Sequence, residues 1–236
     1  MNTRFPIILF LTSLIPACSY LPEALPDEQG LEIREDRHCI EIHPGGGAGF
    51  SPTGLLLYPG GLVDPHAYMD LAASFALSGR GHRVVIAKMP ANLAVLNSGA
   101  AKKITSSIPM EQWVIGGHSL GGAMACSMVR KEEGNFEGLI LMAAYPSSSS
   151  DLSSWKGSVL SITASEDRVV DPETFEEAME RLPPSTSYLE IDGGNHAGFA
   201  SYGPQKGDGD PAISAEEQQQ EVVQMLQNFY DAHALE

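Results

Sequence analysis

The sequence predicts an α/β protein with a mostly parallel central sheet that is covered by helices on both faces. Short runs rich in β-branched residues and leucine alternate with helix-like segments from Gly54 to the C-terminus. Runs that are apolar throughout are typical of strands buried on both faces. One run, residues 113–115, leads into a Gly-His-Ser-Leu-Gly turn at residues 117–121 and then into a helix-like segment rich in small residues. Ligands in such sheets bind beyond the carboxyl ends of the strands, where this turn would lie.

The first 18 residues are expected to be a signal peptide. Arg4 precedes an apolar run over residues 5–15, which is too short to span a bilayer but is typical of a signal-peptide core. The Ile-Pro-Ala-Cys sequence that ends at Cys18 resembles a bacterial lipobox, so we expect lipidation of Cys18 and attachment to a membrane. Isoleucine and proline are unusual there, and an ordinary secretory signal or an uncleaved start stays open.

From these features we expect the protein to lie in the bacterial cell envelope, either lipid-anchored or secreted. Residues 19–30 are interrupted by prolines and are expected to form a tether, and residues 31–236 would form the domain. A length of 236 residues, 43% of them hydrophobic, is sufficient for one domain with a large core.

Charge and cysteine content exclude several classes of function. The net charge of −16 argues against a nucleic-acid partner and against electrostatic docking on anionic lipid. Three cysteines are too few for a disulfide framework, and we expect Cys39 and Cys126 to be buried free thiols. The Cys and His residues lack metal-ligand spacing, so neither a metal nor a cofactor is expected. The oligomeric state is open.

The elements before the Ser turn follow from local patterns. Asp64 would cap a helix with Pro65 at its first position, and this helix would stop at Ser78 and Gly79. The other expected elements are an edge strand or hairpin over 31–42, a turn over 44–49, strands over 55–58 and 84–87, and a weaker helix over 92–107.

The elements after the Ser turn continue the alternation. We expect a helix from the turn to Glu133, strands over 139–143, 159–162 and 188–191, and helices over 172–182 and 215–232. The last helix would bury Val222, Met225, Leu226 and Phe229, which recur at helical spacing. The serine-rich loop over 145–156 is too short for a cap domain, so the pocket should be open.

Ser119 is the candidate nucleophile. At a sharp turn from strand to helix the serine backbone is strained, and the hydroxyl is exposed. Glycines two residues to either side would avoid collisions with the neighbouring strand and helix. Leu120 would open the helix, so that its amide points to the place where an oxyanion would form.

Asp167 and His196 are the candidate partners of Ser119, because each follows a predicted strand and their order along the chain suits this topology. Glu166 would point to the other side of the turn, Asp171 is typical of a helix cap, and Asp192 is too near His196 in sequence. The other histidines are less suitable by position: His38, His43, His66, His82 and His233 do not follow strands in this way, and His118 is fixed inside the turn.

Three further sets of residues are candidates for substrate contacts. The loop over residues 58–63 would supply a second oxyanion donor, with Gly61 the first choice and Leu62 the next. Lys88, at the carboxyl end of a strand, is a candidate for holding an acidic substrate group, and an ordinary solvated lysine is the alternative. Tyr202 and Gln205 are weaker candidates for shaping the pocket.

Together, the Ser119 turn, the Ser-Glu-Asp turn and the Gly-Gly-Asn-His turn resemble the α/β-hydrolase superfamily, in its compact cap-less branch related to dienelactone hydrolases. The resemblance extends from about Gly54 to the C-terminal helix and implies an α/β-hydrolase fold with hydrolase activity carried by Ser119, Asp167 and His196. Dienelactone hydrolases proper have cysteine as nucleophile, so Ser119 argues against that particular reaction.

We therefore expect a serine hydrolase that cleaves carboxylic esters of small or medium acyl size, with a small-molecule ester as substrate. A lactone or amide hydrolase is the alternative among enzymes. A lipid-anchored binding protein that kept the fold and lost turnover is the alternative from another class.

Overall fold

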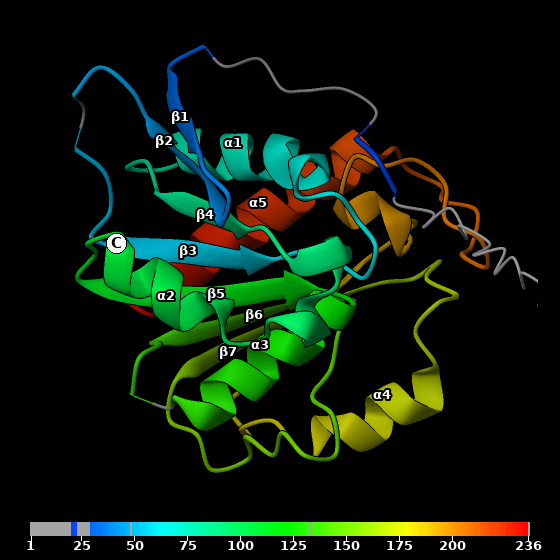
Figure 1. The fold of residues 1–236 in the computed structure, drawn as a ribbon. Coiled ribbons are helices and arrows are strands. Elements are labelled where there is room, and N and C mark those ends of the chain that lie inside the picture. Colours follow the sequence, from blue (N-terminus) through cyan, green and yellow to red (C-terminus); the bar gives the residue numbers. More distant parts are fainter. Residues whose placement is uncertain (1–19, 23–28, 48, 133, 236) are drawn as a thin grey trace, which may run out of the picture.

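An eight-stranded sheet with helices on both faces forms the centre of the protein (Figure 1). The computed structural model of the chain describes residues 20–22, 29–47, 49–132 and 134–235. The strands are β1 (Leu31–Glu35), β2 (Cys39–Pro44), β3 (Thr53–Tyr58), β4 (Val84–Ala87), β5 (Gln112–His118), β6 (Gly138–Met142), β7 (Ser158–Ala164) and β8 (Ser187–Ile191). The helices are α1 (Met69–Leu77), α2 (Ala100–Ser107), α3 (Leu120–Lys131), α4 (Pro172–Met179) and α5 (Ala215–Ala232).

The strand order is β1-β2-β4-β3-β5-β6-β7-β8. Strands β3 to β8 are parallel to one another, whereas β2 pairs antiparallel with both β1 and β4. The segment predicted as an edge strand or hairpin is therefore a hairpin. Its outer strand, β1, is short and carries exposed charged side chains, which protect a sheet edge from pairing with other chains.

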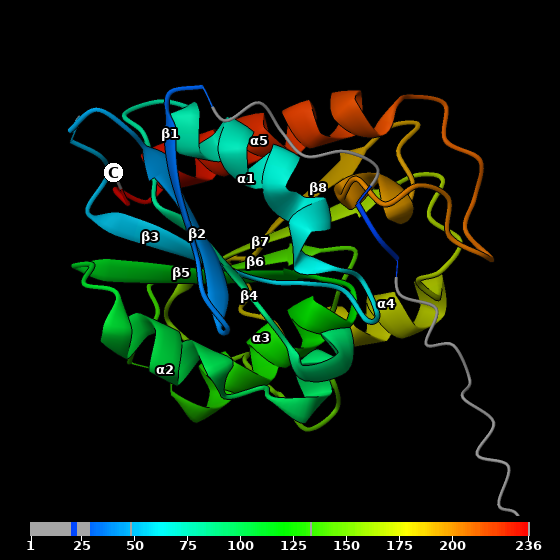
Figure 2. The ribbon, with the colours of Figure 1, turned by 45° about the horizontal axis from the view of Figure 1, so that its top comes forward.

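The two faces of the sheet pack against different helices. Leu55 and Leu57 of β3 pack in a core with α1 and α5, whereas Leu56 between them joins a core with α2 and α3. This alternation follows from the opposite directions of successive side chains along a strand. Figures 1 and 2 show α1 and α5 side by side on one face and α2 and α3 on the other. These findings confirm the predicted fold class.

Side-chain caps fix the starts of three helical segments. Asp64 accepts a hydrogen bond from the amide of His66 at 3.0 Å, and Pro65 begins the turn that leads into α1. That first turn, η1 (Pro65–Tyr68), is a 3-10 helix, and the α-helix starts at Met69. Asp171 caps α4, and Ser214 caps α5 in a capping box with Glu217.

The helix predicted over residues 92–107 is wrong in its first half. That segment contains two short 3-10 turns, η2 (Pro90–Asn92) and η3 (Ala94–Leu96), and α2 begins only at Ala100. Ala91 and Asn92 have positive φ angles of 52° and 54°, which interrupt any regular helix. The helix α4 likewise ends at Met179, three residues before the predicted end.

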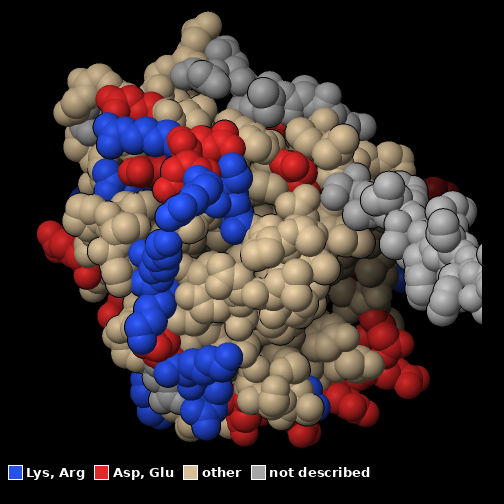
Figure 3. All heavy atoms as spheres, in the orientation of Figure 1, with Lys and Arg blue, Asp and Glu red and all other residues tan. Residues whose placement is uncertain are grey.

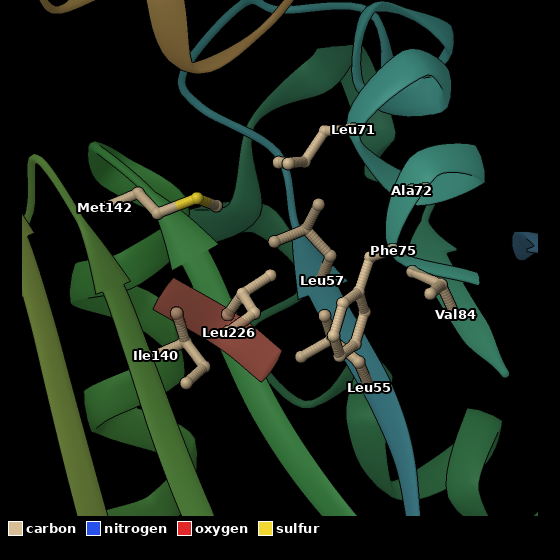
Figure 4. A pocket seen from close by; sticks show the side chains of 9 residues that line it. All are labelled: Leu55, Leu57, Leu71, Ala72, Phe75, Val84, Ile140, Met142 and Leu226. Atoms are coloured by element: carbon tan, nitrogen blue, oxygen red, sulfur yellow. The ribbon is translucent and has the colours of Figure 1, made fainter. Parts of the chain in front are cut away.

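A small void lies in the core between α1, α5 and the sheet (Figure 4). Its volume is about 10 Å³, and apolar residues alone line it, among them Leu55, Phe75, Met142 and Leu226. A space of this size holds at most one water molecule, and its walls offer no polar partner. The void is therefore a packing defect and not a ligand site.

The predicted signal peptide and Cys18 lie outside the described residues. Within the predicted tether, Tyr20 pairs with Val63 in a parallel β-bridge. None of the described helices is long and apolar enough to span a bilayer. Cys39 and Cys126 are both buried and unpaired, as predicted.

Candidate active site

Ser119 lies at a strained turn between β5 and α3. Its φ and ψ angles are 52° and −124°, a conformation that non-glycine residues rarely adopt. The amide of Ser119 donates to the carbonyl of Met142 in β6 at 2.9 Å, which fixes the turn to the neighbouring strand. The strained turn and the helix that begins at Leu120 match the predicted strand-serine-helix geometry.

The glycines around Ser119 allow close backbone contacts. A Cβ atom at Gly117 would lie 2.5 Å from backbone atoms of Gly121 and Gly122, closer than real contacts permit. A Cβ atom at Gly121 would collide with the carbonyl oxygens of Tyr58 and Pro59. The turn therefore needs glycine at both positions, for the steric reason inferred from the motif.

The loop between β3 and η1 offers one free amide to a substrate. Within the described part of the chain, the amide of Gly60 donates to Tyr68 Oη at 2.8 Å, and the amide of Leu62 donates to the carbonyl of Asn92 at 2.7 Å. The amide of Gly61 has no such partner there, and a Cβ atom at Gly61 would lie 3.1 Å from the Leu120 side chain. Of the two predicted donors, the geometry favours Gly61 beside Leu120.

His196 and Asp167 form a hydrogen-bonded pair. His196 Nδ1 lies 2.8 Å from Asp167 Oδ2, and both side chains are almost fully buried. The other oxygen, Asp167 Oδ1, accepts hydrogen bonds from the amides of Val169 and Val170. Burial raises the pKa of the Asp167 carboxyl, but the His196 contact and the two amides outweigh burial and hold that pKa below its ordinary value. Asp167 is thus an ionised partner for His196.

The His196 ring lies beside the Ser119 turn. The ring centroids of His118 and His196 are 4.6 Å apart, and His118 directly precedes the serine. Among the described residues, no hydrogen bond joins the Ser119 hydroxyl to the imidazole of His196. Such contacts are often long without substrate and shorten in the substrate complex.

Two of the other candidate acids, and Lys88, have partners elsewhere. Glu166 forms an ion pair with Arg168 at 3.0 Å, and Asp171 caps α4 through the amide of Thr174. Lys88, which was a candidate for a substrate contact, pairs with Glu35 at 2.6 Å and donates to the carbonyl of Asp36. The structure therefore places the Lys88 ammonium against the β1–β2 hairpin.

Three polar residues that the sequence analysis missed hold the His196 turn. Gln218 of α5 is 1% exposed and hydrogen-bonds both the amide and the carbonyl of Asn195. Asn195 in turn accepts from the amide of Gly198 and donates to the carbonyl of Gly209. Asp208 accepts from the amides of His196 and Ala197.

A second buried network supports the loop that carries Gly61. Tyr68 Oη lies 2.8 Å from His118 Nδ1 and accepts the amide hydrogen of Gly60. Burial holds the pKa of His118 well below its ordinary value, and the neighbouring His196 imidazole lowers it further. His118 is therefore neutral. Because the Tyr68 oxygen already accepts the Gly60 amide, we infer that the Tyr68 hydroxyl donates a hydrogen bond to His118 Nδ1.

A groove of about 220 Å³ opens next to Asp167. Its walls include apolar surface from Ala143, Val170 and Phe175. Tyr202 and Gln205 pair with each other at 2.9 Å, and the Tyr202 ring contacts Tyr20. No cluster of His, Cys, Asp and Glu suited to a metal ion occurs in the described part of the chain.

A family model described as the alpha/beta hydrolase family matches residues 54–220, which is most of the chain. The protein belongs to this family. The match includes Ser119, Asp167 and His196, and confirms the superfamily that the motifs indicated. A search of curated proteins finds no match to this hydrolase.

Solved structures of low sequence identity share the fold. An α/β-hydrolase enzyme from the metagenome of lagoon sediments at Mar Chica, Morocco, is 16% identical, with a TM-score of 0.61 over 86% of this chain and 99% of that one. Carboxylesterase CesB from Bacillus subtilis is 13% identical, with a TM-score of 0.61 over 86% and 92% of the two chains. Dienelactone hydrolase from Anabaena variabilis is 14% identical, with a TM-score of 0.61 over 86% and 98%.

Proposed function

We propose that this hydrolase cleaves carboxylic esters of small or medium acyl size through a covalent acyl-enzyme. The observation that carries the proposal is the His196–Asp167 pair, joined at 2.8 Å, beside the strained turn of Ser119. A serine hydroxyl needs a positioned base to become nucleophilic, and the base needs a carboxylate to orient it.

In the proposed mechanism, Ser119 Oγ attacks the ester carbonyl and His196 Nε2 takes the hydroxyl proton. Asp167 holds the other ring nitrogen and stabilises the imidazolium. The amides of Gly61 and Leu120 donate to the oxyanion, and one such donor is typically worth about 3 kcal/mol in the transition state. His196 then protonates the leaving alcohol. In the second half of the reaction, His196 takes a proton from a water molecule, which attacks the acyl-enzyme. His196 finally returns a proton to Ser119 Oγ as the carboxylic acid is released.

The acyl size is inferred from the segment over residues 145–156. This segment contains no helix or strand that could form a cap, and we infer that the site takes short and medium acyl chains, since no cap encloses a long one. The carboxylesterase and the dienelactone hydrolase among the structural neighbours act on ester bonds by name, which supports the same bond type here.

Hydrolysis of p-nitrophenyl esters of graded acyl length by the full chain tests the proposal. We expect turnover that is highest for short and medium chains and is abolished in Ser119→Ala, with an unchanged circular dichroism spectrum. Turnover retained in Ser119→Ala would refute the assignment.

For localisation, we propose attachment to the cell envelope through a lipid on Cys18, on the basis of the signal-like sequence over residues 1–18. Cys18→Ser should release the protein from membranes on cell fractionation. Unchanged membrane association of that variant would contradict the anchor.

A further inference from the structure

The chain enters the described fold at the loop that carries Gly61. The amide of Tyr20 donates to the carbonyl of Leu62, and the amide of Asp64 donates to the carbonyl of Tyr20, both at 2.9 Å. The Tyr20 ring lies 5.1 Å from the ring of Tyr202, between centroids. Tyr20 is thus fixed directly to the loop next to the candidate nucleophile.

Cys18 is two residues before Tyr20. An extended chain spans at most about 3.5 Å per residue, so the two α-carbons are no more than about 7 Å apart. A lipid on Cys18 would therefore bring the Gly61 loop close to the membrane surface.

The same loop is bordered by exposed apolar side chains. Leu62 donates to the carbonyl of Asn92, which lies in a segment, residues 89–101, that contains no charged residue. Within this segment Val95 and Leu96 are 49% and 59% exposed, and Leu21, next to Tyr20, is 63% exposed. Figure 3 shows that the middle of this face, where the segment between β4 and α2 passes, is free of charged side chains. Leu21 and the pair Val95 and Leu96 thus flank the two segments, at Tyr20 and at Asn92, that are hydrogen-bonded to Leu62, and exposed apolar groups on one part of a surface indicate a contact surface.

We propose that Leu21, Val95 and Leu96 form a contact rim that rests on the lipid bilayer to which Cys18 is attached. The substrate would then be an ester of small or medium acyl size carried by an amphiphile in that bilayer. The proposal rests on the proposed hydrolase activity and on the lipid at Cys18. Water and the ester give a carboxylic acid, which leaves for the aqueous phase, and an alcohol, which takes its proton from His196 and stays with the membrane.

The charge distribution favours apolar contact over electrostatic contact. A net charge of −16 opposes approach to an anionic bilayer, but the uncharged segment over residues 89–101 lets this part of the surface come close. Apolar side chains at the interface add to the binding free energy of a lipid anchor.

Two insertions of equal length test the substrate class. A Gly-Ser linker with an end-to-end distance of roughly 20 Å is placed either between Ser19 and Tyr20 or directly after Pro22, in the full lipidated chain. Dioctanoylglycerol in phosphatidylethanolamine–phosphatidylglycerol vesicles is the membrane ester, and p-nitrophenyl acetate is the soluble one. We expect the first insertion to lower hydrolysis of the membrane ester at least ten-fold, with soluble turnover unchanged, and the second to change neither.

Equal membrane activity in both insertion variants would overturn the proposal. Failure of the unmodified protein to hydrolyse either ester would instead contradict the proposed function, and the substrate class with it.

Energy transfer tests the orientation without any need for turnover. A donor fluorophore is attached to Leu96→Cys at the contact rim, or to Leu77→Cys at the far end of α1, which is 50% exposed. The native Cys39 and Cys126 are buried and should resist labelling. With acceptor dye on the lipid headgroups, transfer should be strong from position 96 and weak from position 77. Equal transfer from both positions would overturn the docking geometry.

Discussion

Asp208 accepts a hydrogen bond from the backbone amide of His196 at 3.2 Å, while Asp167 accepts one from the imidazole of the same residue at 2.8 Å. The second oxygen of Asp208 accepts from the amide of Ala197 at 2.8 Å. Asp208 also accepts a hydrogen bond from the backbone amide of Arg168, the residue directly after Asp167. One carboxylate thus joins the turn of the candidate base to the turn of the candidate acid, and we infer that it is a positioning residue.

Asp208→Asn should lower kcat about ten-fold with little change in KM, because a charged acceptor of backbone amides is lost and the His196 ring is less well placed. Steady-state kinetics on p-nitrophenyl acetate measure the effects on kcat and on KM separately. Asp210→Asn is the control, since this exposed neighbour changes the charge of the same loop equally. A loss of thermal stability without any loss of kcat in Asp208→Asn would show that the residue is only structural.

Asp167→Asn should reduce kcat by several orders of magnitude, because the amide no longer orients and stabilises the imidazolium; the corresponding change in a serine protease triad costs about 10⁴-fold. Glu166→Gln, one residue away and paired with exposed Arg168, should leave kcat near the wild-type value. Kinetics of the two variants on the same ester measure the difference. Similar rates for both would remove Asp167 from the mechanism.

Tyr68→Phe should weaken catalysis through the Gly61 loop. The substitution removes the acceptor of the Gly60 amide and the donor to His118, and leaving such buried groups unpaired costs about 1–3 kcal/mol. Tyr58→Phe removes a comparable hydroxyl, which accepts the amide of Ala101 in α2. Both variants should lose stability in urea, but only Tyr68→Phe should bind a boronic-acid transition-state analogue more weakly. Equal affinity of the two variants for the analogue would contradict this role.

His82 should make the fold sensitive to acid. It is fully buried, its ring stacks on Phe75 at 4.2 Å, and burial lowers its pKa from 6.5 to about 4. The unfolded chain therefore binds more protons between these values, and stability falls as the pH decreases from 6.5 towards 4, by at most about 3 kcal/mol.

Urea unfolding of His82→Phe at pH 7 and pH 4.5 measures this contribution, since phenylalanine keeps an aromatic ring against Phe75 and cannot be protonated. The difference in unfolding free energy between the two pH values should shrink. The exposed His233→Gln variant should behave like the wild type. An unchanged pH dependence in His82→Phe would exclude His82 as the acid-sensitive group.

Sequence patterns were sufficient to predict the strands, helix caps and turns that depend on neighbouring residues alone. The apolar runs of β3 to β7 become buried strands, and Asp64, Asp171 and the Ser119 glycines do what their residue types predict. The choice between Gly61 and Leu62 needed coordinates. It depends on Asn92, thirty residues later in the chain, which takes the amide of Leu62.

The supporting residues that were not predicted form hydrogen bonds to residues far away in the sequence. Gln218 supports a turn 23 residues earlier, and Asp208 bonds to an amide 12 residues away, without a local motif that marks either contact. The sequence did not show that Lys88 has an ion-pair partner. That partner, Glu35, lies in the β1–β2 hairpin, which comes next to Lys88 only because β2 pairs with β4.

The central claim is that Ser119 is an activated nucleophile, and covalent labelling tests it most directly. The full chain is treated with a fluorophosphonate, and the modified residue is located by peptide mass spectrometry. We predict a single adduct on Ser119, with a labelling rate that falls sharply in His196→Ala. No adduct on Ser119, or labelling that proceeds at the wild-type rate in His196→Ala, would contradict the account.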